Sequence, residues 1–415
     1  MVINIKKKEI GGSLFAPASK SVAHRALICA CLRGKDIKIK CDEISEDIKA
    51  TICCLRSLGY NIAIDGEYIN VANTRLDVKS PVLDCNESGS TFRFMLPLVA
   101  ALGCGATFTG KGRLGKRPMK ELFGELERHG VMITHEEDSV LPCVVSGKCD
   151  CGRFSIRGDI SSQYITGLLL SLPIMEKGAV EIVGKIESKP YIDITLDVMK
   201  KFGFSVIDDG GKLVYNGYKE TALAEYSVEG DFSNAAFFIV GGLIGAKEKL
   251  ELRGLSTDSV QGDKAIIDIM RCFGGNIVEL EDSAIVYRSQ LHGAVVDVSD
   301  TPDLAPIIAV AGAAASGVTV IHGCARLREK ESDRIESTIT LINSLGGNAR
   351  VEGDSIIIEG NGTLRGGNVD SFGDHRIAMS AAICSLICEN EVIINGAEAV
   401  DKSFPRFFEI FNSLS

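Results

Sequence analysis

The chain repeats a pattern about every seventy residues, six times in all, and this repeat restricts the possible folds more than any single motif. Amphipathic segments close on glycines at near-constant spacing, at Gly59, Gly130, Gly203, Gly274 and Gly346. Nearly apolar segments recur with the same period and begin with small polar or charged residues, at Ser19, Ser88, Ser161, Asp231, Thr301 and Gly373. A fixed period of this length predicts an architecture of repeated supersecondary units.

Within a unit the predicted order is an apolar helix, a strand, an amphipathic helix that ends at glycine, and a hairpin. In the third copy the apolar helix covers residues 161–175, AVEIVG is a strand, PYIDITLDVMKKFG is the second helix, and the hairpin turns at Asp209-Gly210. The closing glycine suits a left-handed C-cap. Because a helix that is apolar on every face must be buried, we expect the apolar helices inside, with sheets packed around them.

Six units of this size exceed what one core serves, because chains beyond about 250 to 300 residues tend to divide into domains. We therefore expect an α/β (α+β) protein, a two-domain inside-out barrel with buried helices and three units per domain. The last amphipathic helix, Phe404 to Leu414, has no hairpin after it, whereas the N-terminal strand VINIKKK is spare. This strand is predicted to complete the last unit. The domains would be residues 13–227, and residues 1–12 plus 228–415.

Composition places this chain of 415 residues among soluble globular proteins, with 45% hydrophobic and 24% charged residues. The run from Leu304 to Ile321 is uncharged and long enough for a membrane span. Pro306, the Gly and Ser positions of this run and its five equivalents favour a buried core instead. No signal-peptide pattern opens the sequence, and no membrane partner is expected.

The 14 cysteines form no CxxC pair and have no histidine partners at zinc spacing. The CxC pairs Cys29/Cys31 and Cys149/Cys151 are too weak a signal for a metal site, and cysteines within apolar helices behave as small hydrophobic residues. We expect reduced thiols in a cytoplasmic protein that acts as a monomer, with neither a metal nor a cofactor.

A formal net charge of -10 argues against a nucleic-acid-binding protein, which usually carries a basic surface. The basic residues are nevertheless concentrated in two loops, one with Lys111, Arg113, Lys116 and Arg117, the other with Arg326, Arg328, Lys330 and Arg334. Local cationic clefts in an acidic protein attract small anions without binding polyanions in general.

The segment GKGRLG, from Gly110 to Gly115, matches the dinucleotide-binding pattern GxGxxG between a predicted strand and a predicted helix. A dinucleotide site is discounted because the segment lies in the second unit of a repeat, the loop carries several cations, and no acidic partner for a ribose ends a following parallel strand. Taken alone, the segment fits a solvated loop about as well as an anion site.

The starts of the apolar helices carry the candidate binding residues. SKSVAHR places Lys20, Ser21 and Arg25 where backbone N–H groups and the helix dipole favour an anion. An N-cap with two cations reaching to solvent would explain the same residues. In ESGSTFRF, Arg93 lies one turn into an apolar helix and needs a partner, because burying an unpaired cation is costly. The third helix start offers three hydrogen-bonding side chains, of which capping explains one: Ser161, Ser162 and Gln163.

Acids stand among cations at the later helix starts. Asp303 opens the most apolar helix and needs no function as an N-cap or first-turn acid. Burial in a cleft would instead raise its pKa and suit it to act as a general base. Further charges, which a solvated surface would also explain, are Lys330, Glu331, Asp333, Arg334, Asp374, His375 and Arg376. If the helix starts converge, the cleft between the domains is an anion-binding chamber that contains one or two acids.

Together these segments resemble the enolpyruvylshikimate-phosphate synthase (3-phosphoshikimate 1-carboxyvinyltransferase) family over the whole chain. The motifs occur in family order, and several are highly specific: SKSVAHR, ESGSTFRF, KRPM, GDISSQYITGLL, SKPYIDITL, VEGDFSNAAFF, SVQGD, PDLAP, KESDR, GDHRIAM and DKSFP. The resemblance implies two domains of βαβαββ units joined by two crossings. It also implies a transferase of the shikimate pathway, which leads to chorismate and the aromatic amino acids. Such an enzyme transfers the enolpyruvyl group of phosphoenolpyruvate to the 5-hydroxyl of 3-phosphoshikimate and releases phosphate.

The resemblance further implies the site residues. Those that would hold 3-phosphoshikimate are Lys20, Ser21, Arg25, Ser161, Ser162, Gln163 and Ser188. Those that would hold phosphoenolpyruvate are Gly89, Arg117, Gln163, Arg334, Arg376 and Lys402. Asp303 and Lys330 would contact the shikimate hydroxyls, with Asp303 as the proton acceptor, Glu331 as the acid/base near the enol carbon, and Lys20 as a further catalytic group.

Two sequence differences from the family and two alternative assignments bear on the resemblance. Glu87-Ser88-Gly89-Ser90 and Phe94 differ from common family patterns, which leaves sensitivity to glyphosate open. The sister family that acts on UDP-N-acetylglucosamine typically carries a Cys in the loop corresponding to residues 110–118 and Lys-Asn near the first helix, whereas this chain has GKGRLGKRP and Lys-Ser. A non-enzymatic phospho-ligand-binding protein on the same fold would explain the cations but leave Asp303 and Glu331 unused.

Overall fold

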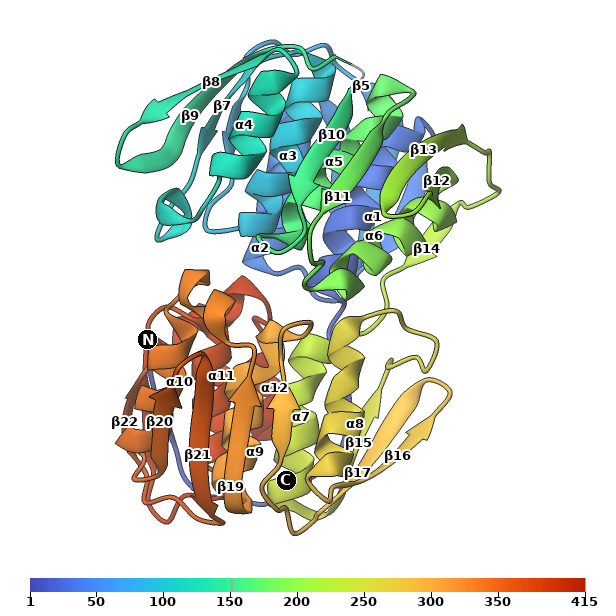
Figure 1. The fold of residues 1–415 in the computed structure, drawn as a ribbon. Coiled ribbons are helices and arrows are strands. Elements are labelled where there is room, and N and C mark those ends of the chain that lie inside the picture. Colours follow the sequence, from blue (N-terminus) through green and yellow to red (C-terminus); the bar gives the residue numbers. More distant parts are fainter. Residues whose placement is uncertain (151, 415) are drawn as a thin grey trace. The chain divides into compact units, whose positions relative to one another are not determined.

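The computed structural model describes residues 1–150 and 152–414, so Cys151 of the second CxC pair lies outside the described residues. The described chain is a mixed α/β fold that divides into two compact units (Figure 1). One unit is Ala18–Val228, hereafter the 18–228 unit. The other combines Met1–Pro17 with Glu229–Ser415, hereafter the 229–415 unit.

The 18–228 unit contains three four-stranded sheets, with the strand orders β14-β3-β5-β4, β6-β7-β9-β8 and β10-β11-β13-β12. The strands are β3 (Ile37–Lys40), β4 (Tyr60–Asp65), β5 (Tyr68–Arg75), β6 (Val82–Asp84), β7 (Ala106–Thr109), β8 (Val131–Glu136), β9 (Ser139–Gly147), β10 (Arg153–Arg157), β11 (Ala179–Val183), β12 (Phe204–Asp208), β13 (Lys212–Tyr218) and β14 (Glu225–Ser227). The helices are α1 (Lys20–Arg33), α2 (Glu46–Ser57), α3 (Gly89–Leu102), η1 (Leu114–Lys116), α4 (Lys120–Arg128), α5 (Ser162–Met175) and α6 (Lys189–Lys201).

The 229–415 unit contains two four-stranded sheets and one three-stranded sheet, with the orders β16-β17-β15-β2, β18-β19-β21-β20 and β1-β23-β22. The strands are β1 (Val2–Ile5), β2 (Ile10–Phe15), β15 (Ala246–Arg253), β16 (Asn276–Leu280), β17 (Ser283–Tyr287), β18 (Val295–Asp297), β19 (Ser316–His322), β20 (Asn348–Glu352), β21 (Ser355–Asn361), β22 (Gly367–Asp370) and β23 (Val392–Asn395). The helices are α7 (Phe232–Gly245), η2 (Gly262–Ala265), α8 (Ile266–Cys272), η3 (Pro302–Leu304), α9 (Ala305–Ala314), η4 (Ala325–Glu329), α10 (Arg334–Ser344), α11 (His375–Cys384), η5 (Ala397–Lys402) and α12 (Phe407–Ser413).

From α1 to β21 the described elements run five times in the order apolar helix, strand, second helix and hairpin, and the sixth copy ends at α12 without a hairpin. In the second sheet, β6 lies parallel to β7, and the hairpin of β8 and β9 continues the sheet antiparallel. Strands are exchanged where the chain passes between the units: β2, which precedes α1, pairs with β15, and β14, which precedes α7, pairs with β3. The N-terminal β1 lies antiparallel to β23 in the sixth sheet, in the place that a hairpin strand takes in the other copies.

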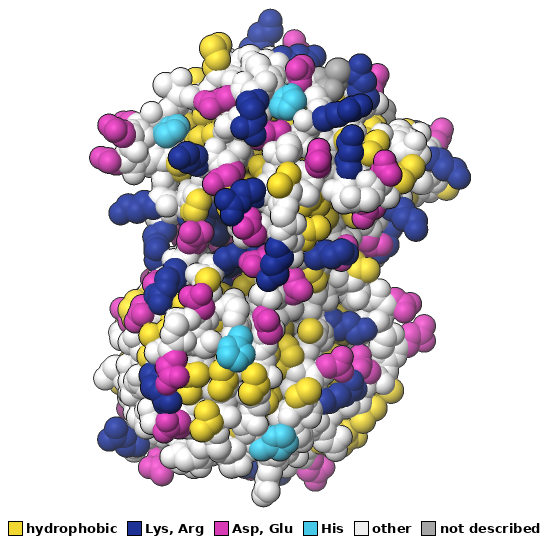
Figure 2. All heavy atoms as spheres, in the orientation of Figure 1, with side chains coloured by type: hydrophobic (Ala, Val, Ile, Leu, Met, Phe, Trp, Pro, Cys, Tyr) yellow, Lys and Arg dark blue, Asp and Glu magenta, His cyan; other side chains and the backbone are white. Residues whose placement is uncertain are grey.

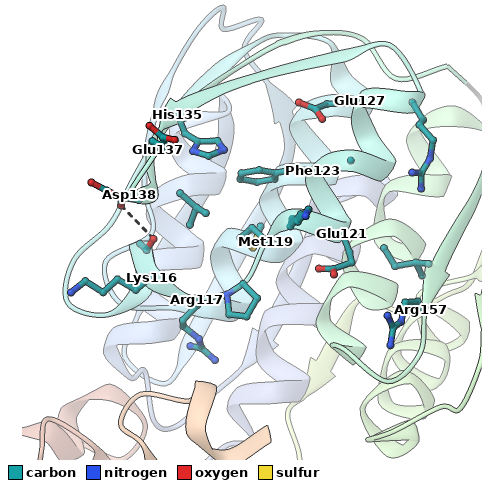
Figure 3. A pocket seen from close by; sticks show the side chains of 18 of the residues that line it. Lys116, Arg117, Met119, Glu121, Phe123, Glu127, His135, Glu137, Asp138 and Arg157 are labelled. Atoms are coloured by element: carbon teal, nitrogen blue, oxygen red, sulfur yellow. Dashed lines mark hydrogen bonds between the residues drawn. The ribbon is translucent and has the colours of Figure 1, made fainter.

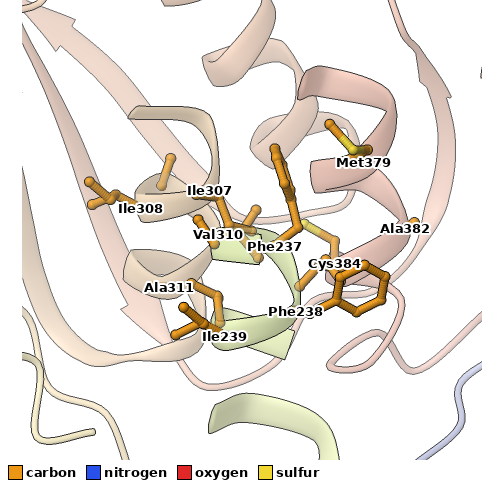
Figure 4. Packing of buried hydrophobic residues seen from close by; sticks show 14 of the residues in the cluster. Phe237, Phe238, Ile239, Ile307, Ile308, Val310, Ala311, Met379, Ala382 and Cys384 are labelled. Carbon is orange, nitrogen blue, oxygen red and sulfur yellow. The ribbon is translucent and has the colours of Figure 1, made fainter. Parts of the chain in front are cut away.

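The apolar helices are buried, as their uniform hydrophobicity predicts. Every residue of α7 is buried, and α9 is buried from Ala305 to Ala313. Figure 4 shows how Phe237 and Phe238 of α7 face Val310 of α9 and Cys384 of α11. The sheets around such helices remain open, each with two edge strands, and the described strands do not close into a continuous barrel.

The glycines that mark the period have the left-handed backbone expected of a C-cap. Their φ angles are 91°, 87°, 94°, 89° and 85° at Gly59, Gly130, Gly203, Gly274 and Gly346. At Gly203 an added Cβ would also lie 2.2 Å from the carbonyl oxygen of Lys219. Larger residues are therefore excluded there by both the backbone angle and the available space.

The uncharged run from Leu304 to Ile321 is not one long helix. It consists of α9 followed directly by β19, as the break at Ser316-Gly317 predicts. Among the described residues, no helix is long and apolar enough to cross a membrane. Figure 2 shows Lys and Arg side chains interspersed with Asp and Glu over the face that it draws.

Deleting residues 1–8 is expected to destabilise the 229–415 unit, because β1 pairs with one edge of β23 and contributes the buried side chain of Ile5. The deletion also removes Lys8, whose Nζ donates to the carbonyl oxygen of Leu414 at 3.0 Å. Hydrogen exchange should accelerate at the amides of β22 and β23 and stay unchanged in β5 and β9. Val2→Ala, at a residue that is 60% exposed, is the matched control. Faster exchange confined to the 18–228 unit would contradict the role given to β1.

Candidate active site

Three cations surround Asp303 in the 229–415 unit. Its Oδ1 lies 2.7 Å from Arg334 Nη1 and 3.5 Å from Lys330 Nζ, and its Oδ2 lies 2.8 Å from Arg376 Nη2. Asp303 belongs to η3, ahead of α9, while Arg334 opens α10 and Arg376 lies in the first turn of α11. Three helix starts therefore meet around one carboxylate.

Arg334 is the centre of this cluster, with a side chain only 1% exposed. Its Nε donates to Asp374 Oδ2 at 2.8 Å, and its Nη2 donates to Glu331 Oε2 at 2.6 Å. Asp374 in turn caps α11, because its Oδ1 accepts from the backbone N–H of Arg376 at 3.0 Å. Burial alone would lower the pKa of Arg334, but the carboxylates of Asp374, Glu331 and Asp303 outweigh burial and raise it. The guanidinium is thus a permanent positive charge.

The pKa of Asp303 is shifted in the direction opposite to our prediction. Burial raises the pKa of this carboxyl, but the charges of Arg376, Lys330 and Arg334 outweigh burial and hold it well below its usual range. The prediction was wrong because it allowed for the loss of water around Asp303 but not for the three cations within contact distance. Asp303 is ionised in the absence of substrate.

Lys330 is the one cation of the cluster that titrates near neutral pH. Burial lowers the pKa of its ammonium group to about 8, although Asp303 acts in the other direction. Lys330 therefore has a proton that it can donate or retain within the working range of an enzyme.

Two further residues of this unit are buried near the same helix starts. Lys402 ends η5, with 7% of its surface exposed. Asp263 lies in η2, and burial together with the charge of Asp303 raises its pKa to about 7. Asp263 was not among the predicted site residues, although the motif SVQGD, which contains it, was available as a signal.

In the 18–228 unit, Arg25 is a buried cation with neutral partners. Its Nε donates to Thr195 Oγ1 at 2.8 Å, its Nη2 to the carbonyl oxygen of Tyr191 at 2.9 Å, and its Nη1 to the carbonyl oxygen of Ser21 at 2.6 Å. Only 2% of Arg25 is exposed, so it does not reach to solvent, which was the alternative interpretation. Burial lowers its pKa to about 10. An uncompensated buried cation of this kind favours an anionic ligand.

Arg93 has the partners that its burial predicts, and these partners join α3 to α5. Its Nη1 donates to Gln163 Oε1 at 2.6 Å, and Gln163 Nε2 donates to Ser90 Oγ at 2.9 Å. Gly89 lies beside two guanidinium groups, because an added Cβ would lie 2.7 Å from Arg117 Nη1 and 2.8 Å from Arg93 Nη1. Any side chain at Gly89 would have to displace these groups.

The remaining predicted residues of this unit occupy helix starts. Lys20 Nζ lies 2.9 Å from Asp47 Oδ2, and both side chains are mostly buried. Ser161 caps α5 by accepting from the backbone N–H of Gln163 at 3.3 Å, and Ser162 follows it as a buried first-turn residue. Ser188 caps the start of α6 with a left-handed backbone, φ 55°, one turn before the Tyr191 carbonyl that binds Arg25.

Each unit therefore brings some of its predicted residues into contact. The 229–415 unit places Asp303, Lys330, Glu331, Arg334 and Arg376 in direct contact, and the 18–228 unit gathers Gly89, Arg117 and Gln163 around Arg93. Within residues 1–150 and 152–414, no group of His, Cys, Asp and Glu side chains has the arrangement of a metal site. The side chains of these clusters can stabilise negative charge and transfer protons.

Comparison with known proteins identifies relatives over nearly the whole chain. Residues 5–411 match the family model described as EPSP synthase (3-phosphoshikimate 1-carboxyvinyltransferase). The chain is 41% identical to the 3-phosphoshikimate 1-carboxyvinyltransferase of Clostridium kluyveri, with 99% of this chain and 97% of that protein covered. It is 40% identical to the enzyme of the same name from Clostridium novyi, with the same coverage. Among solved structures, an EPSP synthase from Acinetobacter baumannii has a TM-score of 0.82 at 26% identity, with 100% of this chain and 98% of that chain covered.

Proposed function

Because the chain belongs to the EPSP synthase (3-phosphoshikimate 1-carboxyvinyltransferase) family, we propose that it transfers the enolpyruvyl group of phosphoenolpyruvate to the 5-hydroxyl of 3-phosphoshikimate. The reaction is an addition followed by an elimination that releases phosphate, and it belongs to the shikimate pathway of aromatic amino acid biosynthesis. The observation that supports it best is the ionised Asp303 held among Arg334, Arg376 and Lys330. Such a cluster offers a proton acceptor beside cations that can hold a phosphate and a carboxylate.

The two substrates are proposed to use different sets of cations. The ligands of 3-phosphoshikimate would be Lys20, Ser21, Arg25, Ser161, Ser162, Gln163 and Ser188. The ligands of phosphoenolpyruvate would be Gly89, Arg117, Gln163, Arg334, Arg376 and Lys402. Since these sets include residues of both units, we propose that the two units share the site. We further propose that the fold is an inside-out barrel of six βαβαββ units. The protein is proposed to be a monomer in the cytoplasm.

Arg25 suits the phosphate of 3-phosphoshikimate because its present partners are neutral hydroxyls and carbonyls. A dianion would compensate a charge that is already buried, so the protein need not break an ion pair to bind it. Arg334 and Arg376, in contrast, are already bound to carboxylates. Phosphoenolpyruvate would have to compete with Asp303 for their N–H groups.

This competition gives Asp303 its role in the reaction. When an anionic substrate engages Arg334 and Arg376, the two cations hold Asp303 less strongly, so the pKa of Asp303 should rise from its depressed value. The carboxylate then becomes a better base for the 5-hydroxyl proton as the hydroxyl oxygen attacks C2 of phosphoenolpyruvate. Glu331, once it has taken up a proton, would give that proton to C3 in the addition. It would take a proton back from C3 in the elimination, as the C2–O bond to phosphate breaks. The fixed guanidinium groups would stabilise charge on the departing phosphate.

The direct test is to mix the purified protein with 3-phosphoshikimate and phosphoenolpyruvate and follow phosphate release. Phosphate should appear only when both substrates are present, together with a product that carries the enolpyruvyl group. Release that requires UDP-N-acetylglucosamine in place of 3-phosphoshikimate would assign the chain to the sister reaction. Binding of both ligands without turnover would indicate a binding protein.

Activity is expected to fall as the pH rises through about 8, because Lys330 loses its proton there. The sign follows from burial, which disfavours the ammonium form and so places its loss below the usual range for lysine. The measurement is the pH profile of kcat/KM for wild type and for Lys330→Arg, which stays protonated. The alkaline limb should move to higher pH in the variant. An unchanged limb would assign it to another group.

A further inference from the structure

A pocket of about 860 Å³ lies in the 18–228 unit between α4, the β8–β9 hairpin and the loop that contains η1 (Figure 3). Met119, Phe123, Val140 and Ile156 give it an apolar lining. Of the residues assigned above to the substrates, only Arg117 lines it. The pocket is therefore mostly separate from the groups that the proposed reaction uses.

Gly124 is an unexplained glycine on the wall of this pocket. It lies in the middle of α4, where glycine is less favourable than alanine because it adds backbone entropy to the unfolded chain. An added Cβ would meet no atom within 4 Å, and the backbone of Gly124 does not have a positive φ angle. Neither crowding nor backbone geometry requires glycine here. The effect of Gly124 is to leave open space beside Phe123.

The pocket has an aromatic side. The ring of Phe123 and the ring of His135 have centroids 5.4 Å apart and are inclined at 48°. Figure 3 shows both rings at the pocket, with Met119 on the other side of Phe123. Aromatic ligands favour offset or edge contacts with such rings, in addition to the burial of their apolar surface. A planar aromatic group is thus the chemical fit for the space over Gly124.

Lysine side chains lie on the η1 side of the pocket. Lys116 belongs to η1, and Lys120 opens α4 four residues later. Neither forms an ion pair with another described residue, although acids line the pocket on more than one side: Glu121, Glu127, Glu137 and Asp138 (Figure 3). A negative group on a ligand would be attracted to Lys116 and Lys120 and repelled by Glu127 and Glu137, which lie beyond Phe123.

We propose that this pocket binds a planar aromatic carboxylate. The ring lies against Phe123 in the space that Gly124 leaves open, and the carboxylate points to Lys116 and Lys120. This ligand class differs from both proposed substrates, which are not aromatic. The site also differs from the clusters around Asp303 and Arg25, because its lining is apolar and its cations are exposed.

The test uses the full chain and two probes with the same ring and opposite charge, 2-naphthoate and 2-naphthylmethylammonium. Their dissociation constants are measured by titration of the ring-proton NMR signals, with saturating 3-phosphoshikimate present to occupy the proposed phosphate site. Naphthoate should bind at least about tenfold more tightly than the ammonium probe. Gly124→Leu, which fills the space, should weaken naphthoate binding by about tenfold or more, whereas Gly124→Ala should weaken it much less.

Two further measurements on Gly124→Leu show whether the variant is folded. Leucine favours a helix more than glycine, so the thermal midpoint should not fall, and phosphate release should be unchanged because Gly124 touches no proposed substrate ligand. Equal affinity of wild type and Gly124→Leu for naphthoate, or equal affinity of wild type for both probes, would overturn the proposal. Absence of phosphate release in wild type would instead overturn the proposed function, and the comparison of naphthoate affinities would still hold.

Discussion

Replacing Asp303 with asparagine is expected to lower kcat by at least about 10²-fold, the usual effect of losing a general acid or base. An amide cannot accept the substrate proton, and it has no charge to place opposite Arg334, Arg376 and Lys330. Affinity for the substrates should change much less than kcat. The measurements are initial rates of phosphate release and the dissociation constants of both ligands from calorimetry.

Glu336→Gln is the matched control for this variant. Glu336 also lies at the start of α10, but its side chain is 61% exposed and contacts only Arg328 among the ion pairs of the described residues. Its loss should leave kcat nearly unchanged. Wild-type turnover in Asp303→Asn would remove Asp303 from the mechanism, and the same comparison with Glu331→Gln decides the role of Glu331.

Replacing Arg334 with methionine should destabilise the 229–415 unit by about 3 to 5 kcal/mol, since removing one partner of a buried ion pair leaves the other charges uncompensated. Asp374 is 0% exposed and cannot recover hydration without a local rearrangement. The loss should be detected as a lower urea midpoint and as faster hydrogen exchange in α9, α10 and α11. Activity should also be lost, because Arg334 is a proposed ligand of phosphoenolpyruvate.

Arg350→Met is the matched control, because it removes an arginine with carboxylate partners at an exposed position. Arg350 also contacts two carboxylates, Glu352 and Glu359, but its side chain is 46% exposed. Surface ion pairs contribute little, because water and salt screen them. The midpoint should therefore be nearly unchanged. A loss of less than about 1 kcal/mol in Arg334→Met would mean that the buried carboxylates find other partners.

Much of the fold was predictable because its signals are local and periodic. The glycines after the amphipathic helices and the polar residues before the apolar ones act within a few residues of the backbone that they shape. The exchange of β2 and β14 was not predictable in the same way, because their partners, β15 and β3, are chosen by packing at long sequence separation. Local patterns identify a strand but not its neighbours in the sheet.

The sequence indicated which charged residues stand at the helix starts, but it did not indicate which groups they contact. Lys20, Arg25 and Arg93 were recognised at helix starts, but the sequence did not indicate that Lys20 contacts Asp47 or that Arg25 contacts Thr195. The pKa of Asp303 shows the consequence. Its direction depends on how many cations lie within about 4 Å, and all three come from segments beyond α9 and β19. Contacts of this kind require the folded structure.

The late partners of β1 and β2, which are β23 and β15, also set an order of events during synthesis of the chain. All strands of the 18–228 unit lie within its own sequence, so its sheets can form once β14 has left the ribosome. β1 cannot pair until β23 has been synthesised. At a synthesis rate of about 5 to 20 residues per second, β23 follows β14 by roughly ten to thirty seconds. Until then β1 is an unpaired strand that other chains could capture, and the charges of Lys6, Lys7 and Lys8 beside it discourage such aggregation.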